Sequence, residues 1–176
     1  LPTECPALPC DGKIAARIER LLPFALTEGQ QTAVREITGD MADTRPMNRM
    51  LQGDVGSGKT VVAAYAMLVA IAHQHQAVIM APTEILARQH FRTMQHMLAK
   101  SRVNIGFLSG SLKAAQRRSI LEEIKDGTIN LIIGTQAIVQ KNVEFHRLGL
   151  AVVDEGHRFG VRQRARLKQG DVEPHY

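Results

Sequence analysis

A glycine-rich segment in the first half of the chain has the residue types and spacing of a phosphate-binding loop. It fits the pattern G-x-x-x-x-G-K-[ST] at every position, through Gly53, Asp54, Val55, Gly56, Ser57, Gly58, Lys59 and Thr60. The glycines let backbone N–H groups approach phosphate oxygens, and a helix beginning near Lys59 would add the positive end of its dipole. Lys59 can span the β- and γ-phosphates of ATP, and the Thr60 hydroxyl suits Mg²⁺. The segment therefore predicts a site for ATP with Mg²⁺.

Two adjacent carboxylates could complete this chemistry. Asp154 and Glu155 follow an apolar run at residues 148–153, which suits a central parallel strand. Asp154 would then hold Mg²⁺ at the carboxyl edge of a sheet, where open α/β folds bind ligands. Glu155 could orient or deprotonate the water that attacks the γ-phosphate. The pair favours hydrolysis over phosphate transfer. A small phosphotransferase is the alternative, although we find no candidate for an arginine-bearing lid.

These groups must be positioned by elements that alternate along the chain. We expect strands at residues 49–52, 77–80, 103–108, 129–133 and 148–153, and helices at residues 59–74, 83–98 and 112–125. Such alternation indicates an α/β fold with a mostly parallel sheet covered by helices on both faces. Ile14, Ile18 and Leu21 repeat at helical spacing before this region. A further helix begins at Thr27, which forms an S/T-x-x-E/Q capping box with Gln30.

Composition limits the class of protein. The length of 176 residues suits one domain, and 44% hydrophobic and 22% charged residues are normal for a globular protein. No run approaches the roughly 20 apolar residues of a membrane helix, so we expect no membrane partner. Cys5 and Cys10 are a poor zinc or disulfide signal and indicate incidental thiols in a reducing cytoplasm. The net charge of +5 permits an anionic partner, while the absence of Trp argues against an aromatic platform for bases.

With these motifs in place, the sequence resembles superfamily 2 helicases, and within them the bacterial RecG family of branched-DNA translocases. The likeness extends from about Leu22 to Gly170 and rests on five blocks, at residues 22–30, 47–60, 80–87, 133–137 and 154–161. The blocks around Pro82 and His157 are more specific than the phosphate loop. Transcription-repair coupling translocases share this layout.

The resemblance implies a RecA-like P-loop NTPase fold and a motor function. Residues 23–176 would be the first RecA-like, ATP-binding domain, truncated at its C-terminal end, and residues 1–22 the end of an upstream linker or helix. The implied activity is ATP hydrolysis to ADP and phosphate by a cytoplasmic bacterial helicase that acts on branched DNA in recombination and repair. Two alternatives stay open: a transcription-repair coupling translocase, and an ATP-controlled docking module without motor activity.

The resemblance also assigns roles to individual residues. Gln30 would read adenine, with Phe24 near the base, although the capping box explains Gln30 equally well in physical terms. His157 would link hydrolysis to movement along DNA, although a histidine after a strand is often only a local hydrogen-bonding group. Two departures stand out: Gly156 replaces the usual glutamine, and Gln136 replaces a common histidine.

Three short segments resemble turns that contact the DNA backbone. They are represented by Pro82, Thr83 and Arg88, by Gly110 and Ser111, and by Gly134 and Thr135. Helix N-termini, hydroxyl groups and glycines suit contact with phosphates but carry no base sequence. Each turn alone could equally be a plain helix cap. The basic segment at residues 158–168 could contact DNA or a partner domain, or form a solvated helix face.

The family pattern continues beyond what this chain contains. Neither a Ser/Thr-Ala-Thr motif, nor a second RecA-like domain with its arginine finger, nor the wedge domain that recognises branched DNA is found in the 176 residues. Such an arginine contributes about 10³–10⁵ in turnover. We therefore expect this chain alone to bind ATP, to hydrolyse it slowly, and to bind DNA weakly and with strong salt dependence.

Overall fold

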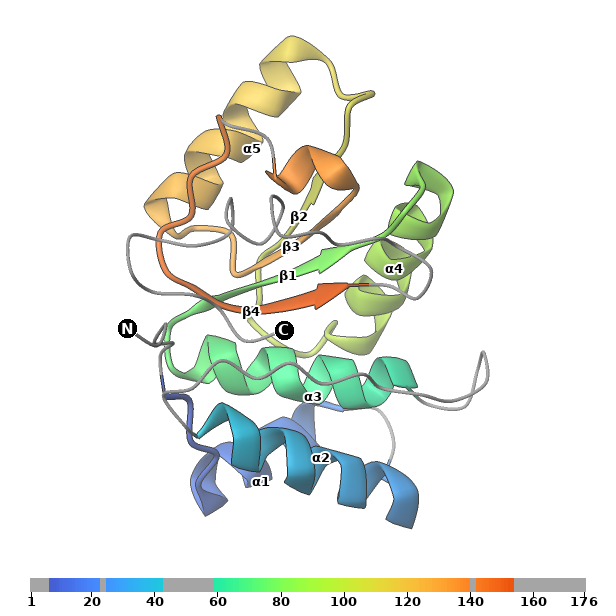
Figure 1. The fold of residues 1–176 in the computed structure, drawn as a ribbon, viewed down its shortest axis with the longest axis vertical. Coiled ribbons are helices and arrows are strands. Elements are labelled where there is room, and N and C mark those ends of the chain that lie inside the picture. Colours follow the sequence, from blue (N-terminus) through green and yellow to red (C-terminus); the bar gives the residue numbers. More distant parts are fainter. Residues whose placement is uncertain (1–6, 23–24, 43–58, 140–141, 154–176) are drawn as a thin grey trace, which may run out of the picture.

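The strands of the domain form one parallel sheet. The computed structural model describes residues 7–22, 25–42, 59–139 and 142–153. Within these ranges the sheet has the order β2-β3-β1-β4, with β1 at Gln76–Met80, β2 at Ile105–Leu108, β3 at Leu131–Gly134 and β4 at Leu148–Val153. Every neighbouring pair is parallel. The predicted α/β fold is confirmed, as Figure 1 shows.

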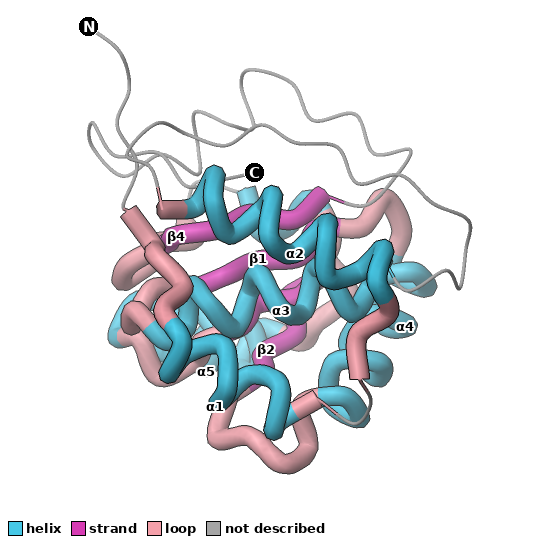
Figure 2. Tube along the Cα trace, turned by 90° about the horizontal axis from the view of Figure 1, so that it is seen from below, coloured by secondary structure: helices cyan, strands magenta, loops and turns pink. Residues whose placement is uncertain are grey.

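Helices cover both faces of the sheet. Helices α3 (Lys59–Ala72) and α4 (Glu84–Met97) pack on one face, and α5 (Ala114–Asp126) packs on the other. Helices α1 (Gly12–Leu21) and α2 (Glu28–Met41) lie outside α3. Figure 2 shows α2 and α3 crossing in front of the strands when the molecule is seen from that side. None of the described helices is long and apolar enough to span a membrane.

The strands divide the apolar side chains between two cores. In β1, Ala77 and Ile79 belong to the core under α3, whereas Val78 and Met80 belong to the core under α5. All five residues of β1 are buried. Because side chains alternate across a strand that is covered on both faces, the sequence of such a strand is continuously apolar. This explains why the strands were visible as apolar runs.

The ends of several elements differ from the predicted ranges. Helix α3 ends at Ala72, before a turn in which Gln74 has a φ of 60°. The strand predicted at residues 103–108 begins at Ile105, and the one predicted at 129–133 is Leu131–Gly134. The reason is local: the N–H of Asn104 donates to Asn130 Oδ1 at 2.9 Å, and the N–H of Ile129 donates to the Glu123 carbonyl at 3.1 Å. These contacts replace strand pairing there.

Other predicted ends are close to the observed ones. Helix α5 starts after Lys113 and stops at Gly127, whose φ of 86° is the left-handed conformation that glycine adopts readily. The helix predicted at residues 83–98 is α4, with Thr83 and Leu98 as its caps. The strand predicted at residues 49–52 and the basic segment at 158–168 lie outside the described residues.

A buried glutamine joins three segments at the amino end of the sheet. Gln76 is 3% exposed. Its amide nitrogen donates to the carbonyls of Ile124 and Ile129, both at 2.9 Å. Its amide oxygen accepts from the N–H groups of His146 and Arg147, at 2.8 and 3.1 Å. Both donors and both acceptor positions of the carboxamide are used, so it fixes the end of α5 and the segment before β4.

The N-terminal segment shares the core under α3. Leu8 and Ile18 are fully or almost fully buried in this cluster. The N–H of Leu8 donates to the Met41 carbonyl at 2.6 Å, and Asp11 caps α1 by accepting from the N–H of Ile14 at 2.9 Å. The residues that the resemblance assigns to an upstream linker or helix are thus packed against α3 and its core.

Candidate functional site

The carboxyl ends of the four strands lie in one row. Leu108, Gly134, Met80 and Val153 are the last residues of β2, β3, β1 and β4, and they are paired in register across the sheet. Each strand is followed directly by a segment that the sequence predicts to be functional. Along this edge the order is residues 109–111, then Thr135, then Pro82, and then Val153, the residue before Asp154 in the sequence. Open α/β sheets bind ligands at this edge.

Helix α3 begins at the same edge. It is joined to β1 by a turn at residues 73–75, so it runs back along the sheet and starts where the strands end. Figure 1 shows the arrows of β1 and β4 pointing to the side of the molecule on which α3 begins. Lys59 opens this helix, and Thr60, which is half-buried, stands in its first turn. Residues 53–58, Phe24, Asp154, Glu155 and His157 lie outside the described residues.

The segment after β1 caps helix α4. Pro82 and Thr83 are exposed, and the Thr83 hydroxyl oxygen accepts from the N–H of Leu86 at 3.3 Å. The N–H of Ala81 donates to the Gly134 carbonyl at 2.9 Å, which ties this segment to the end of β3. Thr83 is therefore a helix cap, as the simpler interpretation held, and it leaves the first turn of α4 at the exposed edge.

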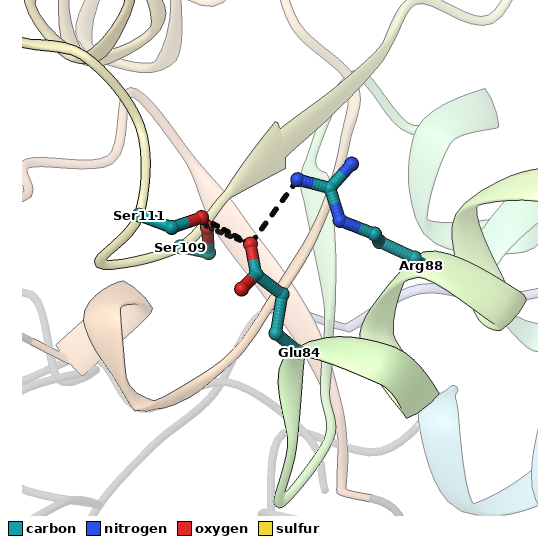
Figure 3. Close-up of polar contacts among 4 residues, drawn as sticks. All are labelled: Glu84, Arg88, Ser109 and Ser111. Atoms are coloured by element: carbon teal, nitrogen blue, oxygen red, sulfur yellow. Dashed lines mark hydrogen bonds and ion pairs between the residues drawn. The ribbon is translucent and has the colours of Figure 1, made fainter.

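The turn after β2 is held by a carboxylate from α4. The hydroxyls of Ser109 and Ser111 both donate to Glu84 Oε1, with a Ser109–Glu84 distance of 2.9 Å. Arg88 Nη2 donates to the same oxygen at 3.1 Å (Figure 3). The hydrogen bonds from Ser111 and then Ser109, with a smaller contribution from Arg88, hold the pKa of Glu84 below its usual range. Glu84 is therefore ionised at neutral pH.

Arg88 is also held from its other side. Its guanidinium lies over the Phe107 ring, 4.8 Å from the ring centre. Phe107 in turn meets the ring of Phe91 edge-on, with the centres 5.7 Å apart. A guanidinium that stacks on an aromatic face and pairs with a carboxylate loses much of its rotational freedom. Half of the Arg88 side chain is nevertheless exposed, so its remaining N–H groups can reach a ligand.

The turn after β3 is explained in part by packing. A Cβ atom on Gly134 would lie 1.9 Å from the Leu108 carbonyl oxygen, so only glycine fits between these strand ends. Thr135 begins the 3₁₀ turn η1 (Gln136–Val139), and its hydroxyl oxygen accepts from the N–H of Ala137 at 3.4 Å. By contrast, nothing lies within 4 Å of a Cβ placed on Gly110. Packing therefore requires glycine at position 134 but not at position 110.

The predicted capping box at the start of α2 is confirmed. The N–H of Thr27 donates to Gln30 Oε1 at 2.8 Å, and the N–H of Gln30 donates to the Thr27 hydroxyl at 3.2 Å. Helix α2 packs along α3, and Figure 1 shows the two helices beginning on the same side of the molecule. Contact of Gln30 with adenine stays a prediction.

Two hydrogen-bonding side chains, one at the site and one at the opposite end of the sheet, were missed from the sequence. Glu84 was recognised only as part of a motif, and its serine partners lie 25 and 27 residues away. Gln76 carried no sequence signal apart from being a polar residue at the start of an apolar run. In the part of the chain that the structure describes, no three His, Cys, Asp or Glu side chains gather as metal ligands.

Comparisons with known proteins agree with this arrangement. A model of the DEAD/DEAH box helicase family matches residues 27–171. The chain is 52% identical to the ATP-dependent DNA helicase RecG of Streptococcus pneumoniae over 87% of its own length and 22% of the relative's. It is 43% identical to RecG of Aquifex aeolicus, over 98% and 22% of the two lengths.

A solved structure of RecG bound to a three-way DNA junction has a TM-score of 0.81 and 41% identity to this chain, and the match covers 89% of this chain and 22% of that one. The chain thus spans about a fifth of the length of these relatives. The family match covers most of the chain and includes the sheet edge described above. This chain belongs to the DEAD/DEAH box helicase family.

Proposed function

We propose that this chain is the ATP-binding domain of an ATP-dependent DNA helicase that acts on branched DNA in recombination and repair. One observation carries the proposal: the start of α3, the end of β4 and the three turns that follow β1, β2 and β3 meet at one edge of the sheet. This arrangement supports the proposal, because the residues proposed for ATP and those proposed for DNA follow neighbouring strands in the sequence or open the adjacent helix. The similarity to RecG, including the structure on a three-way junction, supports branched DNA as the substrate.

The nucleotide side of the edge suits ATP with Mg²⁺. Thr60, in the first turn of α3, and Asp154, directly after β4, offer the hard oxygen donors that Mg²⁺ prefers. When bound, Mg²⁺ would neutralise charge on the phosphate oxygens. Lys59 and the glycine-rich loop would bind the β- and γ-phosphates, and Glu155 would accept a proton from the attacking water. His157 would connect this site with the DNA side.

The DNA side offers hydrogen-bond donors to phosphates but no side chains that could read the base sequence. The exposed residues there are Pro82, Thr83, Arg88, Gly110 and Ser111, and no aromatic platform stands beside them among the described residues, because Phe91 and Phe107 are half-buried. The N-terminus of a helix and a cationic side chain suit the DNA backbone, and α4 and Arg88 supply both. We infer binding that depends on DNA shape and charge rather than on sequence.

The experiment compares ATP binding and ATP hydrolysis in the full-length protein. Glu155→Gln should retain ATP binding and lose DNA-stimulated hydrolysis by about 10²-fold or more, because only the proton acceptor is changed. Lys59→Ala should weaken ATP binding itself. Branched DNA should stimulate hydrolysis in the unaltered protein more than linear duplex of the same length.

Two outcomes would contradict the proposal. Hydrolysis that DNA does not stimulate would favour an ATP-controlled docking module, and loss of ATP binding in Glu155→Gln would remove the assigned role of that residue. We further propose that the full-length protein adds a second RecA-like domain and a wedge domain, and that it works in the bacterial cytoplasm. The relatives named above are bacterial and several times longer than this chain.

A further inference from the structure

A single carboxylate oxygen joins two of the turns at the proposed DNA-binding edge. Glu84 stands in the first turn of α4, and its Oε1 accepts from Ser109, Ser111 and Arg88. Ser109 is 1% exposed, so its hydroxyl needs a hydrogen-bond partner within the protein, and Glu84 supplies it. Ser111 and Arg88 are exposed. Figure 3 shows the serines and the arginine converging on the carboxylate from opposite sides.

The serine hydroxyls have no proton left for a DNA phosphate in this arrangement. Each hydroxyl has one O–H donor, and both donors point to Glu84 Oε1. The two serine oxygens also lie 3.0 Å apart, so a bond between them would compete for the same protons. The Ser111 side chain thus serves to hold the turn, which leaves the backbone N–H groups of the turn as the candidates for contact with DNA.

The same carboxylate orients a cation. Arg88 gives one N–H to Glu84 and lies on the Phe107 ring, so its plane is set by two neighbours. A guanidinium has five N–H donors in a fixed fork, and four of them are not used by this bond. The charge of Arg88 also balances that of Glu84, which keeps a carboxylate tolerable beside a site for a phosphate.

We propose that Glu84 is a positioning residue for DNA binding: it fixes the 109–111 turn and the Arg88 guanidinium beside the start of α4, so that together they present donors to DNA phosphates. This inference rests on the function proposed above. It separates two roles within one turn, with side chains that anchor and a backbone that contacts DNA.

The direction in which DNA affinity changes when Glu84 is removed distinguishes a positioning role from a simple charge effect. If Glu84 acted only through its negative charge, its removal would strengthen the binding of an anionic strand. If it positions the turn and Arg88, its removal weakens binding, although the protein becomes more positive. The two mechanisms therefore predict opposite shifts.

The experiment measures DNA-stimulated ATP hydrolysis by the full-length protein as a function of the concentration of a three-way DNA junction. Glu84→Ala should raise the junction concentration for half-maximal stimulation about 5- to 10-fold, as expected when hydrogen bonds to a charged group are lost. The rate at saturating junction should change much less. Glu84→Gln, which keeps an acceptor for the serines, should recover part of the loss.

Two further variants complete the design. Ser111→Ala should reproduce the part of the loss that comes from the turn, because the bonds from Ser109 and Arg88 to Glu84 remain. The double variant should be little worse than Glu84→Ala alone, because Glu84→Ala already removes the bond from Ser111. Glu122→Gln, which removes one exposed charge near the C-terminal end of α5, is the matched control. It should leave the junction concentration for half-maximal stimulation unchanged.

Each other result has a definite meaning. Tighter or unchanged junction binding in Glu84→Ala would overturn the positioning role, and so would losses that add in the double variant. If the unaltered protein showed no stimulation by DNA, the proposed function would fail first, and the inference that rests on it would fall with it. Stimulation in the unaltered protein that Glu84→Ala leaves intact would contradict the inference alone.

Discussion

Single residues at the sheet edge have separable reasons for their identity. Gly134 and Gly110 both occur in segments predicted to contact DNA, yet only Gly134 is required by the backbone around it. Thr83 and Thr135 serve as local caps for α4 and η1, which is compatible with DNA contact but does not depend on it. A change at one of these positions therefore tests either folding or binding.

The same substitution should destabilise the protein at Gly134 and leave its stability nearly unchanged at Gly110. Gly134→Ala would place a Cβ against the Leu108 carbonyl, so we expect a loss in the free energy of unfolding of about 1–3 kcal/mol or more, measured by denaturant titration. Gly110→Ala meets open space and should leave stability within about 0.5 kcal/mol. If a phosphate approaches this turn closely, Gly110→Ala should still weaken junction binding. Equal destabilisation by both changes would show that the strand ends are not packed as described.

At the scale of elements, the start of helix α2 allows two interpretations of Gln30. The capping box is formed, so the helix alone accounts for a hydrogen-bonding side chain at this position. The resemblance adds a role in reading adenine. Helix α2 begins on the same side of the molecule as α3, which keeps that role possible in space.

A conservative change separates these roles. Gln30→Glu retains a side-chain acceptor for the N–H of Thr27, because Glu serves as well as Gln in a capping box, but removes the amide donor. We expect stability to stay nearly constant, while the preference for ATP over other nucleoside triphosphates decreases. Gln30→Ala should lose both that preference and about 1 kcal/mol of stability. Unchanged nucleotide preference in Gln30→Glu, measured from competition binding, would leave Gln30 with the capping role only.

The parts of the fold that can be predicted from the sequence are those whose contacts join residues close together in the sequence or whose residues are buried on both faces. The strands were found because both of their faces are buried, and the capping box because its partners are three residues apart. The link from Glu84 to Ser111 was not found, because it spans 27 residues and exists only once β1 and β2 are placed with β3 between them. The role of Gln76 was hidden for the same reason.

The sequence predicts which residues belong to the candidate site, whereas the order of the strands in the sheet determines how these residues are arranged. In the sequence, the three turns follow one another as Pro82, Gly110 and Gly134. Along the sheet edge, the order is Gly110, Gly134 and Pro82, because β1 lies between β3 and β4. No local pattern encodes this order.

At the scale of the whole molecule, the chain is basic, and the DNA contacts that we propose all lie at one edge of the sheet. The net charge is +5, and the three turns can neutralise only a few phosphates. For roughly three phosphates of a single strand, the logarithm of the affinity should fall with that of the salt concentration with a slope of about −2. Fluorescence anisotropy of this chain with labelled single-stranded DNA, from low to physiological salt, measures that slope. A slope near zero, or a marked base preference, would contradict binding through the backbone.

The buried carboxamide of Gln76 has a consequence for the order in which the chain folds during synthesis. Its four partners follow it by 48, 53, 70 and 71 residues. Until Arg147 has left the ribosome, burial of this amide would leave polar atoms without partners, which is unfavourable. The first residue of β1 is therefore expected to stay in water while β2 and β3 are made, so that β4 completes the domain and β1, although early in the sequence, becomes fully enclosed late.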